Sequence, residues 1–347
     1  MAEQTLDAIE QMSRQALERH GARPDIAASV AHAIRVAESR GNKICGLYYL
    51  ESYCLQLESG RIPSSTDPVV HQERPGAVRV DGQLGFAQWA FAAGFDAAVA
   101  SAQANGICGF SVEHTHTCTS VGYFTEQFAR AGLLAIGCTN ATPRVAPPGG
   151  SVPLLGTNPI AMAVPDGNGG VRFQFDFSTS AVALGTITRA KAAGETIPLG
   201  WAADADGNPT TDPAAALEGS LQSAGGYKGY GFGLMVELLA SALTGGRRSV
   251  DVPPLKAPTG DPHDLGQFYI VIDPGAYSDA GFYDHLASLA GSLAEQPGAR
   301  LPGEHAATQD PVEIEDDVWA LVASLAGGAS GRRWPEANHS PKRAGAS

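Results

Sequence analysis

The sequence predicts an α/β protein, and its pattern of apolar residues is the reason. Residues 5–57 place apolar side chains at helical spacing, which indicates an N-terminal helical layer. Beyond residue 72 the pattern changes to short buried strands, such as 107–112 and 268–272, that alternate with helical stretches. That alternation is typical of an α/β domain built on a large sheet.

The expected elements follow in order from the glycine and proline residues that end them and from the apolar runs between these residues. The N-terminal layer should hold helices at 5–20, 24–41 and 47–57, and then a Pro/Ser-rich linker at 62–68. The central part should begin with a strand at 78–80 that runs into an Asp-Gly turn, followed by a helix at 86–104. Strands at 107–112 and 133–138 should follow, with a helix at 123–131 between them. A strand at 173–177, a helix at 229–243 and a strand at 268–272 should complete this part. The last part should hold a helix at 318–326 and a basic, polar tail, 331–347, that we expect to be disordered.

Composition excludes several classes of protein. The 347 residues are 44% hydrophobic and 17% charged, which is the balance of a folded globular chain. A formal net charge of −13 repels phosphate backbones and anionic lipid, so we expect no nucleic-acid or membrane partner. The N-terminus lacks a signal-peptide pattern, and the five cysteines form no CxxC pair. A cytoplasmic protein with free thiols is therefore expected.

Gly-containing polar clusters recur through the middle of the chain and form the candidate binding site. They are Pro148-Gly149-Gly150, Gly156-Thr157-Asn158-Pro159, Asp176-Phe177-Ser178-Thr179-Ser180 and Gly225-Gly226-Tyr227-Lys228-Gly229. Such clusters offer backbone N–H groups to an anion, and a lysine just before a helix can reach a phosphate. Each cluster alone also fits an ordinary turn. The Rossmann fingerprint GxGxxG does not follow the first strand.

Taken together, the clusters resemble the malate/L-lactate dehydrogenase family that uses a non-Rossmann cofactor domain. The ordered strings PPGG, GTNP, GNPTTDP and KGYG carry the resemblance, which extends from Glu38-Ser39-Arg40-Gly41 to Pro302-Gly303-Glu304. The family includes ureidoglycolate and sulfolactate dehydrogenases, diketogulonate reductases and piperideine-2-carboxylate reductases. The resemblance implies an N-terminal helical layer and a central cofactor domain with a large mixed sheet.

The resemblance also implies NAD(H) or NADP(H) as cofactor and a division of the chain into three parts. These are an N-terminal helical segment, 1–72, a cofactor-binding α/β domain, 73–299, and a C-terminal segment, 300–347, that closes the site. The implied cofactor-binding residues are Asn140, Ala141, Asp176, Phe177, Ser178, Lys228, Gly229, Gly303 and Glu304. The family's subunits pair with the active site near their interface, which implies a homodimer.

Two segments depart from the family's catalytic pattern. The family motif RG-x-x-SHG, followed by a substrate-binding arginine, matches a run in which Ile44-Cys45 replace Ser-His and Tyr49 replaces the arginine. A tyrosine cannot form a bidentate clamp on a carboxylate. The motif S-x-H-x-G-x-x-x-Y places Thr117 at the catalytic histidine, with His116 one residue away. A threonine does not titrate near neutral pH and cannot act as that base.

Three hypotheses remain open at this point. A local backbone slip brings His116 into the acid/base position, or the site is rebuilt with Tyr49, Cys45 or Thr117 as hydrogen-bond donors, or the fold survives without redox activity. Cys45 and Tyr49 also fit simple packing roles. His114, His116 and Cys118 alternate as metal ligands do, but no fourth ligand stands out, so we expect no metal site.

The resulting prediction is an NAD(P)H-dependent oxidoreductase that reduces a C=O or C=N bond of a small organic substrate, or catalyses the reverse oxidation. Because the carboxylate-binding arginine is missing, we expect a substrate other than malate or lactate, and a role in specialised metabolism. The alternatives are a non-redox enzyme (an isomerase, lyase or cyclase) and a non-catalytic binding protein.

Overall fold

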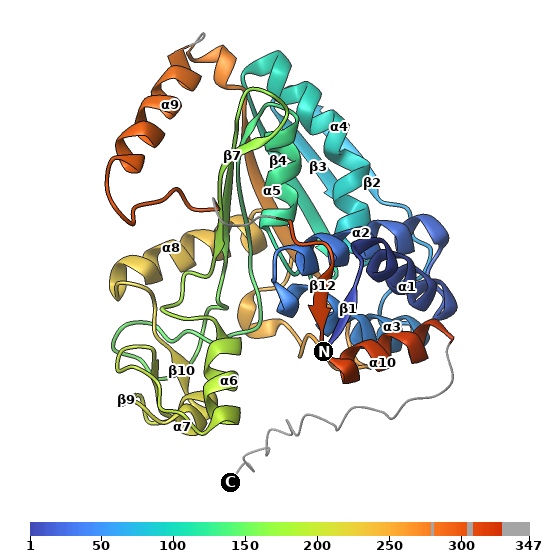
Figure 1. Cartoon of the computed structure of the whole chain (residues 1–347), viewed down its shortest axis with the longest axis vertical. Helices are drawn as coiled ribbons and strands as arrows, with labels where there is room; N and C mark the ends of the chain where they lie inside the picture. The colour runs from blue at the N-terminus through green and yellow to red at the C-terminus, as the bar shows by residue number, and fades with distance from the viewer. Residues whose placement is uncertain (279–280, 304–307, 328–347) are drawn as a thin grey trace.

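A seven-stranded mixed sheet forms the centre of the protein in a computed structural model that describes residues 1–278, 281–303 and 308–327 (Figure 1). Its spatial order is β2 (Val69–Arg74), β3 (Ala77–Asp81), β4 (Ile107–Thr115), β11 (Leu265–Ile272), β5 (Leu134–Thr139), β6 (Ile160–Pro165) and β7 (Val171–Phe177). Only β3 and β4 pair in parallel; the other neighbours in this sheet are antiparallel. The fold class predicted from the sequence is confirmed.

Strand β11, which is the last strand of this sheet in chain order, occupies the middle of the sheet. In β11, Tyr269 lies opposite Phe110 of β4 on one side and Gly137 of β5 on the other. A side chain at Gly137 would clash with the Tyr269 ring, because a Cβ at that position would lie 2.6 Å from the ring. Glycine therefore lets the two central strands pack around a buried aromatic ring.

Helices α4 (Ala87–Asn105) and α5 (Gly122–Arg130) cover one face of the sheet. Aromatic side chains form that interface, with Phe91 in ring contact with Phe110, Phe124 and Tyr269. The opposite face is covered only in part, by α8 (Tyr227–Glu237) and a π-helical turn, Leu238–Ala242. Among the apolar side chains of that face, those of Ile136, Met162 and Ile270 remain half-buried.

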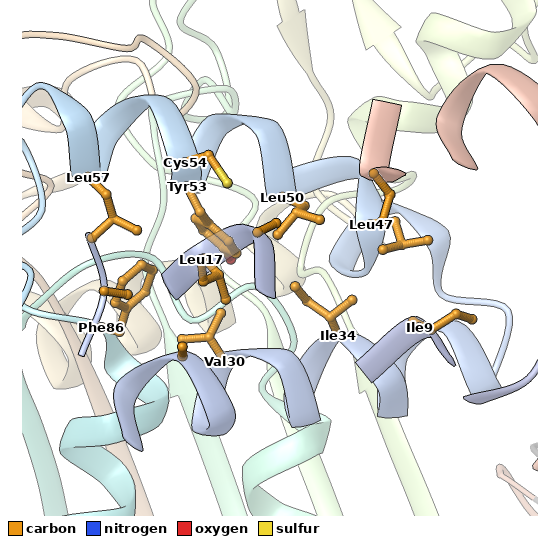
Figure 2. Close-up of a cluster of buried hydrophobic side chains, with 14 of the residues drawn as sticks. Ile9, Leu17, Val30, Ile34, Leu47, Leu50, Tyr53, Cys54, Leu57 and Phe86 are labelled. Atoms are coloured by element: carbon orange, nitrogen blue, oxygen red, sulfur yellow. The ribbon is translucent and has the colours of Figure 1, made fainter. Parts of the chain in front are cut away.

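The N-terminal layer packs on the β4 side of the sheet and has its own core. It consists of α1 (Leu6–Arg19), α2 (Pro24–Ser39) and α3 (Leu50–Glu58). Figure 2 shows how Ile9, Leu17, Val30, Ile34, Leu50 and Tyr53 converge between these helices. Each of these side chains is at most 2% exposed, so the layer is a packed unit and not a loose arm.

The end of the chain returns to this N-terminal layer. Strand β12 (Val312–Ile314) pairs with β1 (Ala2–Gln4), and α10 (Asp316–Ala326) packs on α1 and α3 (Figure 1). Before that return, α9 (Gly281–Ala294) has no buried side chain, and its Tyr283 lies close to Gly167 in the loop between β6 and β7. The predicted cofactor residue Glu304 and the tail 331–347 lie outside the described residues.

A smaller lobe lies below the sheet in Figure 1 and has its own hydrophobic core, separate from those of the sheet and of the N-terminal layer. It contains α6 (Leu184–Ala193), α7 (Pro213–Glu218) and the strands β8 (Ala202–Ala203), β9 (Pro209–Thr210) and β10 (Ser220–Leu221). Ile187, Ala202 and Leu221 are buried in it. The lobe reaches the N-terminal layer where Ile44 packs against Gly185 so closely that a Cβ there would lie 2.6 Å from Ile44 Cδ1.

Several predicted elements need correction. The sequence pattern missed the edge strand Val69–Arg74, which follows the linker at 62–68, and the buried strand Ile160–Pro165. The Asp-Gly pair at 81–82 ends β3 before α4, whereas the hairpin turn lies at 75–76. The predicted helix 229–243 begins at Tyr227 and becomes a π-helix after Glu237. No helix within the described part of the chain is long and apolar enough to cross a bilayer.

Candidate active site

A pocket opens where α2, the loop between β4 and α5, and the end of β7 meet. It encloses about 680 Å³ of space, counting its open mouth. Its described lining consists of Ala33, Val36, Ala37, Arg40, Asn42, Cys118, Thr119, Ser120, Gly122, Tyr123, Gln174, Phe175, Asp176 and Gly303. Two predicted cofactor residues, Asp176 and Gly303, are therefore part of one pocket.

Asp176 is the carboxylate of this pocket. Its Oδ2 accepts hydrogen bonds from the Gly122 amide at 2.8 Å and from the Ser120 hydroxyl at 2.9 Å. The side chain keeps solvent-accessible area along the pocket, yet the surrounding walls desolvate it and raise the pKa of its carboxyl group. The two donors fix one oxygen, so the carboxylate is oriented before a ligand arrives.

Arg40 also lines the pocket, and its side chain is held by two partners. One guanidinium nitrogen forms an ion pair with Glu126, and Nη1 donates to Gln174 Oε1 at 3.2 Å. The buried Nε has no hydrogen-bond partner among the described residues. Because Glu126 also forms an ion pair with Arg130, two arginines share one carboxylate, whereas Asp176 has no cationic partner among the described residues and presents an unpaired carboxylate to a ligand.

The residues that the resemblance places at the family's Ser-His and arginine positions are absent from the pocket lining. Cys45 is half-buried, and burial together with the nearby Asp176 raises the pKa of its thiol to about 12. Tyr49 packs against Tyr53 with ring centroids 5.6 Å apart, and burial raises the pKa of its hydroxyl. A thiol that holds its proton this firmly is no nucleophile at neutral pH.

His116 and Thr117 do not line the pocket. A bulge between β4 and β11 at residues 113–114 does shift the backbone, with His114 at φ 52°. The shift turns His116 into the N-terminal layer, where its Nε2 lies 2.9 Å from Gln56 Oε1 and its ring stacks on His263 at 3.8 Å. Burial beside that ring lowers the pKa of His116 far below the usual histidine range. The slip exists, but it does not deliver an imidazole to the pocket.

Thr117 is buried at 8% exposure, and its backbone N–H donates to His263 Nδ1 at 3.3 Å. Two residues later, Thr119 lines the pocket with φ 63°. The match that puts Thr117 at the motif's histidine puts Thr119 at the motif's glycine. A β-branched residue is strained in this left-handed region, which glycine occupies freely. The pocket wall is therefore rebuilt over two positions.

The predicted cofactor loops are tied together behind the end of β7. The Thr179 amide donates to Thr157 O at 2.9 Å, and the Ala224 amide donates to Thr179 O at 3.0 Å. These bonds join the segment that begins with Asp176, Phe177 and Ser178 to the loop that leads into α8. Lys228, exposed, lies in the first turn of α8, and Gly229 packs so closely on Ala224 that a Cβ there would collide with the Ala224 carbonyl.

Asn140 and Ala141 occupy the base of the same cluster of loops. The Asn140 side chain is buried and donates to Arg247 O at 2.8 Å. The Ala141 backbone faces Gly156, where a Cβ would come within 2.6 Å of the Ala141 carbonyl. These two residues thus position the loops by their backbone contacts, while Gly303 packs on Gln174 at the mouth of the pocket.

The residues present fit a nicotinamide dinucleotide. The amides of Asn42 and Gln174 and the hydroxyl of Ser120 can pair with a carboxamide, and Phe175 offers an apolar face to a ring. The exposed Lys228 at a helix N-terminus supplies positive potential for a diphosphate. Sequence reasoning missed Arg40, Ser120 and Gln174, although Arg40 stands in the quoted run ESRG.

The mixed sheet with its helical layer, and a pocket between α2, the loop after β4 and the end of β7, are consistent with a non-Rossmann α/β enzyme. The profile of the family described as malate/L-lactate dehydrogenase matches residues 5–320. The chain is 38% identical to the (2R)-3-sulfolactate dehydrogenase (NADP(+)) of Chromohalobacter salexigens, over 92% of this chain and 96% of that protein. It is 37% identical to the Δ1-pyrroline-2-carboxylate reductase of Ancylobacter novellus, over 86% and 89% of the two chains.

Solved structures agree with this assignment. The Δ1-piperideine-2-carboxylate reductase of Pseudomonas syringae pathovar tomato superposes with a TM-score of 0.87 at 31% identity, over 94% of this chain and all of that chain. The sulfolactate dehydrogenase of Methanocaldococcus jannaschii gives a TM-score of 0.86 at 28% identity, over 94% and 98%. The protein belongs to the malate/L-lactate dehydrogenase family and is, as a member, a nicotinamide-dependent oxidoreductase.

Proposed function

We propose that the protein catalyses the NADPH-dependent reduction of a protonated C=N bond in a small organic substrate. One observation carries the choice of C=N over C=O: of the described residues that line the pocket, none is a histidine, while one, Asp176, is an uncompensated carboxylate. An iminium ion is a cation, so a nearby carboxylate stabilises it. The relatives named as pyrroline- and piperideine-2-carboxylate reductases support this choice.

The chemistry of an iminium explains how the family's histidine can be lost. The bound nicotinamide supplies a hydride; the iminium carbon accepts it, and the C=N electron pair moves to nitrogen to give a neutral amine. No proton enters from the enzyme in that step. Reduction of a ketone, in contrast, produces an alkoxide that must be protonated, and a general acid contributes about 10² to 10⁴ in rate there.

The chain's own residues have defined tasks in this proposal. Ser120 and the Gly122 amide hold Asp176 so that its second oxygen faces the iminium nitrogen. Arg40, held by its ion pair with Glu126, donates to Gln174 and forms no ion pair with Asp176. Lys228 and the loop before α8 hold the diphosphate, with NADP(H) favoured by the relative whose name specifies NADP(+). Malate and lactate lack a C=N bond and fit this pocket poorly.

A homodimer is part of the proposal. Helix α8 and the following π-helical turn leave Phe232, Met235, Leu238 and Leu243 exposed at 41% or more. The adjacent face of the sheet is apolar and half-buried in a single chain. Apolar surface of this kind marks a protein interface, and a second copy of the chain would cover it. Light scattering should give twice the chain mass of 35.8 kDa.

Location and setting complete the proposal. All five cysteines are free thiols, which suits the reducing cytoplasm. The rebuilt pocket wall around Thr119 suits a tailoring step in specialised metabolism, where the substrate differs from the family's usual acids.

The test is oxidation of NADPH with cyclic imines as substrates. We expect purified protein to consume NADPH with Δ1-piperideine-2-carboxylate or Δ1-pyrroline-2-carboxylate, and not with pyruvate or oxaloacetate. Asp176→Asn should lower kcat/KM for the imine by about 10- to 100-fold, because a charge-assisted contact is lost. Asp96→Asn, the same change at an exposed position of α4 outside the pocket lining, serves as control. If Asp176→Asn weakens only NADPH binding, measured by calorimetry, Asp176 is a cofactor residue alone and the assigned role is wrong.

A further inference from the structure

Helix α8 carries Lys228 in its first turn, yet little of the helix is buried. Its buried residues are Gly229, Gly233 and Val236, a narrow stripe in which two of the three members have no side chain. Phe232, in the same helix, is 56% exposed. Apolar burial contributes about 25 cal/mol per Å², and a glycine has no side chain to bury. Polar contacts must therefore hold α8 in place in the single chain.

Asn158, from the string GTNP, supplies the central polar contact. Its side chain is fully buried, and its Nδ2 donates to the Gly233 carbonyl at 2.9 Å and to Glu237 Oε2 at 3.0 Å. A Cβ at Gly233 would lie 3.2 Å from Thr179 Oγ1, so glycine lets the helix approach closely enough for these bonds. One amide thus joins the middle and the end of α8 to the loop before β6.

Glu237, the last residue of α8, is the second part of this contact. Its Oε1 accepts from the Ser249 amide at 2.6 Å, and its Oε2 accepts from the Ser249 hydroxyl at 2.5 Å. Hydrogen bonds to a carboxylate are about twice as strong as those between neutral groups. The chain changes from α-helix to the π-helical turn directly after Glu237, and such turns are frequent at functional sites. We call Asn158, Glu237 and Ser249 the α8 clamp.

The loop that carries Asn158 is itself fixed. Thr179 Oγ1 lies 3.1 Å from the carbonyl oxygens of both Thr157 and Asn158. The Thr179 carbonyl accepts from the Ala224 amide at 3.0 Å, in the loop that leads into α8. Asn158 has φ 39°, in the left-handed region that asparagine enters more readily than most residues. The α8 clamp and the loop before α8 therefore form one hydrogen-bonded unit.

We propose that Asn158 and Glu237 are positioning residues for the cofactor, because they fix α8 so that Lys228 at its other end meets the diphosphate. A helix moves as a rigid element, so contacts at its middle and end set the place of its first turn. Neither Asn158 nor Glu237 lines the described pocket or touches the cofactor in this proposal. The inference rests on the proposed function in one respect, the contact between Lys228 and the diphosphate.

The test measures NADPH binding by calorimetry, which needs no substrate. Asn158→Gly keeps a residue that adopts a positive φ without strain and removes the amide, so it should raise the Kd by about 10-fold. Asn158→Asp places an oxygen against the Gly233 carbonyl and the Glu237 carboxylate, and it should raise the Kd at least as much. Asn168→Gly, the same change at an exposed position before β7, is the matched control. An unchanged Kd in both Asn158 variants overturns the inference.

Glu237→Gln tests the same clamp with a change that keeps the size of the side chain. Its amide group presents a donor to groups that are donors themselves, so it should raise the Kd by about 3- to 10-fold. Glu218→Gln, at the exposed last residue of α7, is the matched control. This pair decides the question if circular dichroism shows that the Asn158 variants do not fold. Light scattering on the same samples should show an unchanged mass, and a variant that changes the mass overturns the inference.

A double-mutant cycle with Lys228→Ala separates positioning from a general loss of structure. If the clamp acts through Lys228, Asn158→Gly should change the Kd by less than about 2-fold once Lys228 is alanine. Equal factors in both backgrounds overturn the inference and leave the contact of Lys228 with the diphosphate standing. If Lys228→Ala alone leaves the Kd unchanged, that part of the proposed function fails, and the inference fails with it.

Discussion

Acidification should destabilise this protein through two buried histidines. His116 and His263 stack at 3.8 Å and are 2% and 1% exposed, with the Arg61 guanidinium near enough to lower both pKa values. Burial is the larger cause, and it brings the pKa of His263 to about 3. Because the folded-state pKa is depressed, each histidine is neutral in the fold and takes up a proton on unfolding below pH 6.5. Stability is therefore intact above that pH and is lost as the pH falls towards the folded pKa.

The size of this destabilisation follows from the width of the pH range over which only the unfolded histidines are protonated. Between pH 6.5 and 4.5 the unfolded chain binds one proton more at each histidine, at about 1.4 kcal/mol per pH unit, or about 3 kcal/mol each. Two histidines give about 5 to 6 kcal/mol, comparable with the whole stability of many domains. His114 runs the other way: its contact with Asp264 raises its pKa, so its stabilisation is present below pH 6.5 and fades as the pH rises through the folded value.

The assay is urea unfolding by circular dichroism at pH 7.0, 5.5 and 4.5. His263→Gln removes one of the two protons, so it should recover about 3 kcal/mol of the acid loss relative to its own value at pH 7.0. His285→Gln, at an exposed position of α9, leaves the pH dependence unchanged. Contributions from His114 and from carboxylates are common to all three proteins and cancel. A wild-type free energy of unfolding that stays flat from pH 6.5 to 4.5 refutes the argument.

Three further outcomes are expected. Lys228→Ala should weaken NADPH binding by about 1.5–3 kcal/mol, since a charge-assisted phosphate contact is lost. Lys191→Ala, at an exposed lysine of α6, is the matched control, and an unchanged Kd for Lys228→Ala in calorimetry contradicts the prediction. Thr119→Gly should raise the free energy of unfolding by about 1 kcal/mol, because it relieves a β-branched residue held at φ 63°; a loss of stability in urea unfolding contradicts that strain. Malate and lactate should give no measurable reduction of NADP⁺, and efficient turnover of either would place the anion site elsewhere.

The fold was largely predictable because its core elements carry strong local patterns. The helices of the N-terminal layer bury regular apolar faces, and β4, β5 and β11 are continuous apolar runs. The missed strand Val69–Arg74 lies at a sheet edge and alternates too few buried residues to show a period of two. The strand Ile160–Pro165 is apolar throughout and short, a pattern that periodicity alone cannot assign. That α10 returns to α1 is a tertiary pairing with no local signal.

The sequence predicted site residues correctly only where backbone conformation, marked by glycine and polar residues, shapes the pocket. Asp176 and Gly303 fell in the pocket because glycine-rich and polar strings mark loops. His116 faces away because the bulge at residues 113–114 changes the alternation of β4, and a single sequence does not reveal a bulge. Glu304 and the tail 331–347 stay predictions.

The replacements expected at the family's histidine and arginine positions are linked by charge as well as by position. A histidine that donates a proton and an arginine that clamps a carboxylate suit a keto acid, which enters as an anion and leaves as an alcohol. Here the pocket keeps an acid, Asp176, oriented by Ser120. A substrate that brings its own proton on nitrogen needs no imidazole, and its positive charge uses the carboxylate that a keto acid would avoid. Hydride transfer to an iminium therefore remains possible without the histidine, because that step requires no proton from the protein.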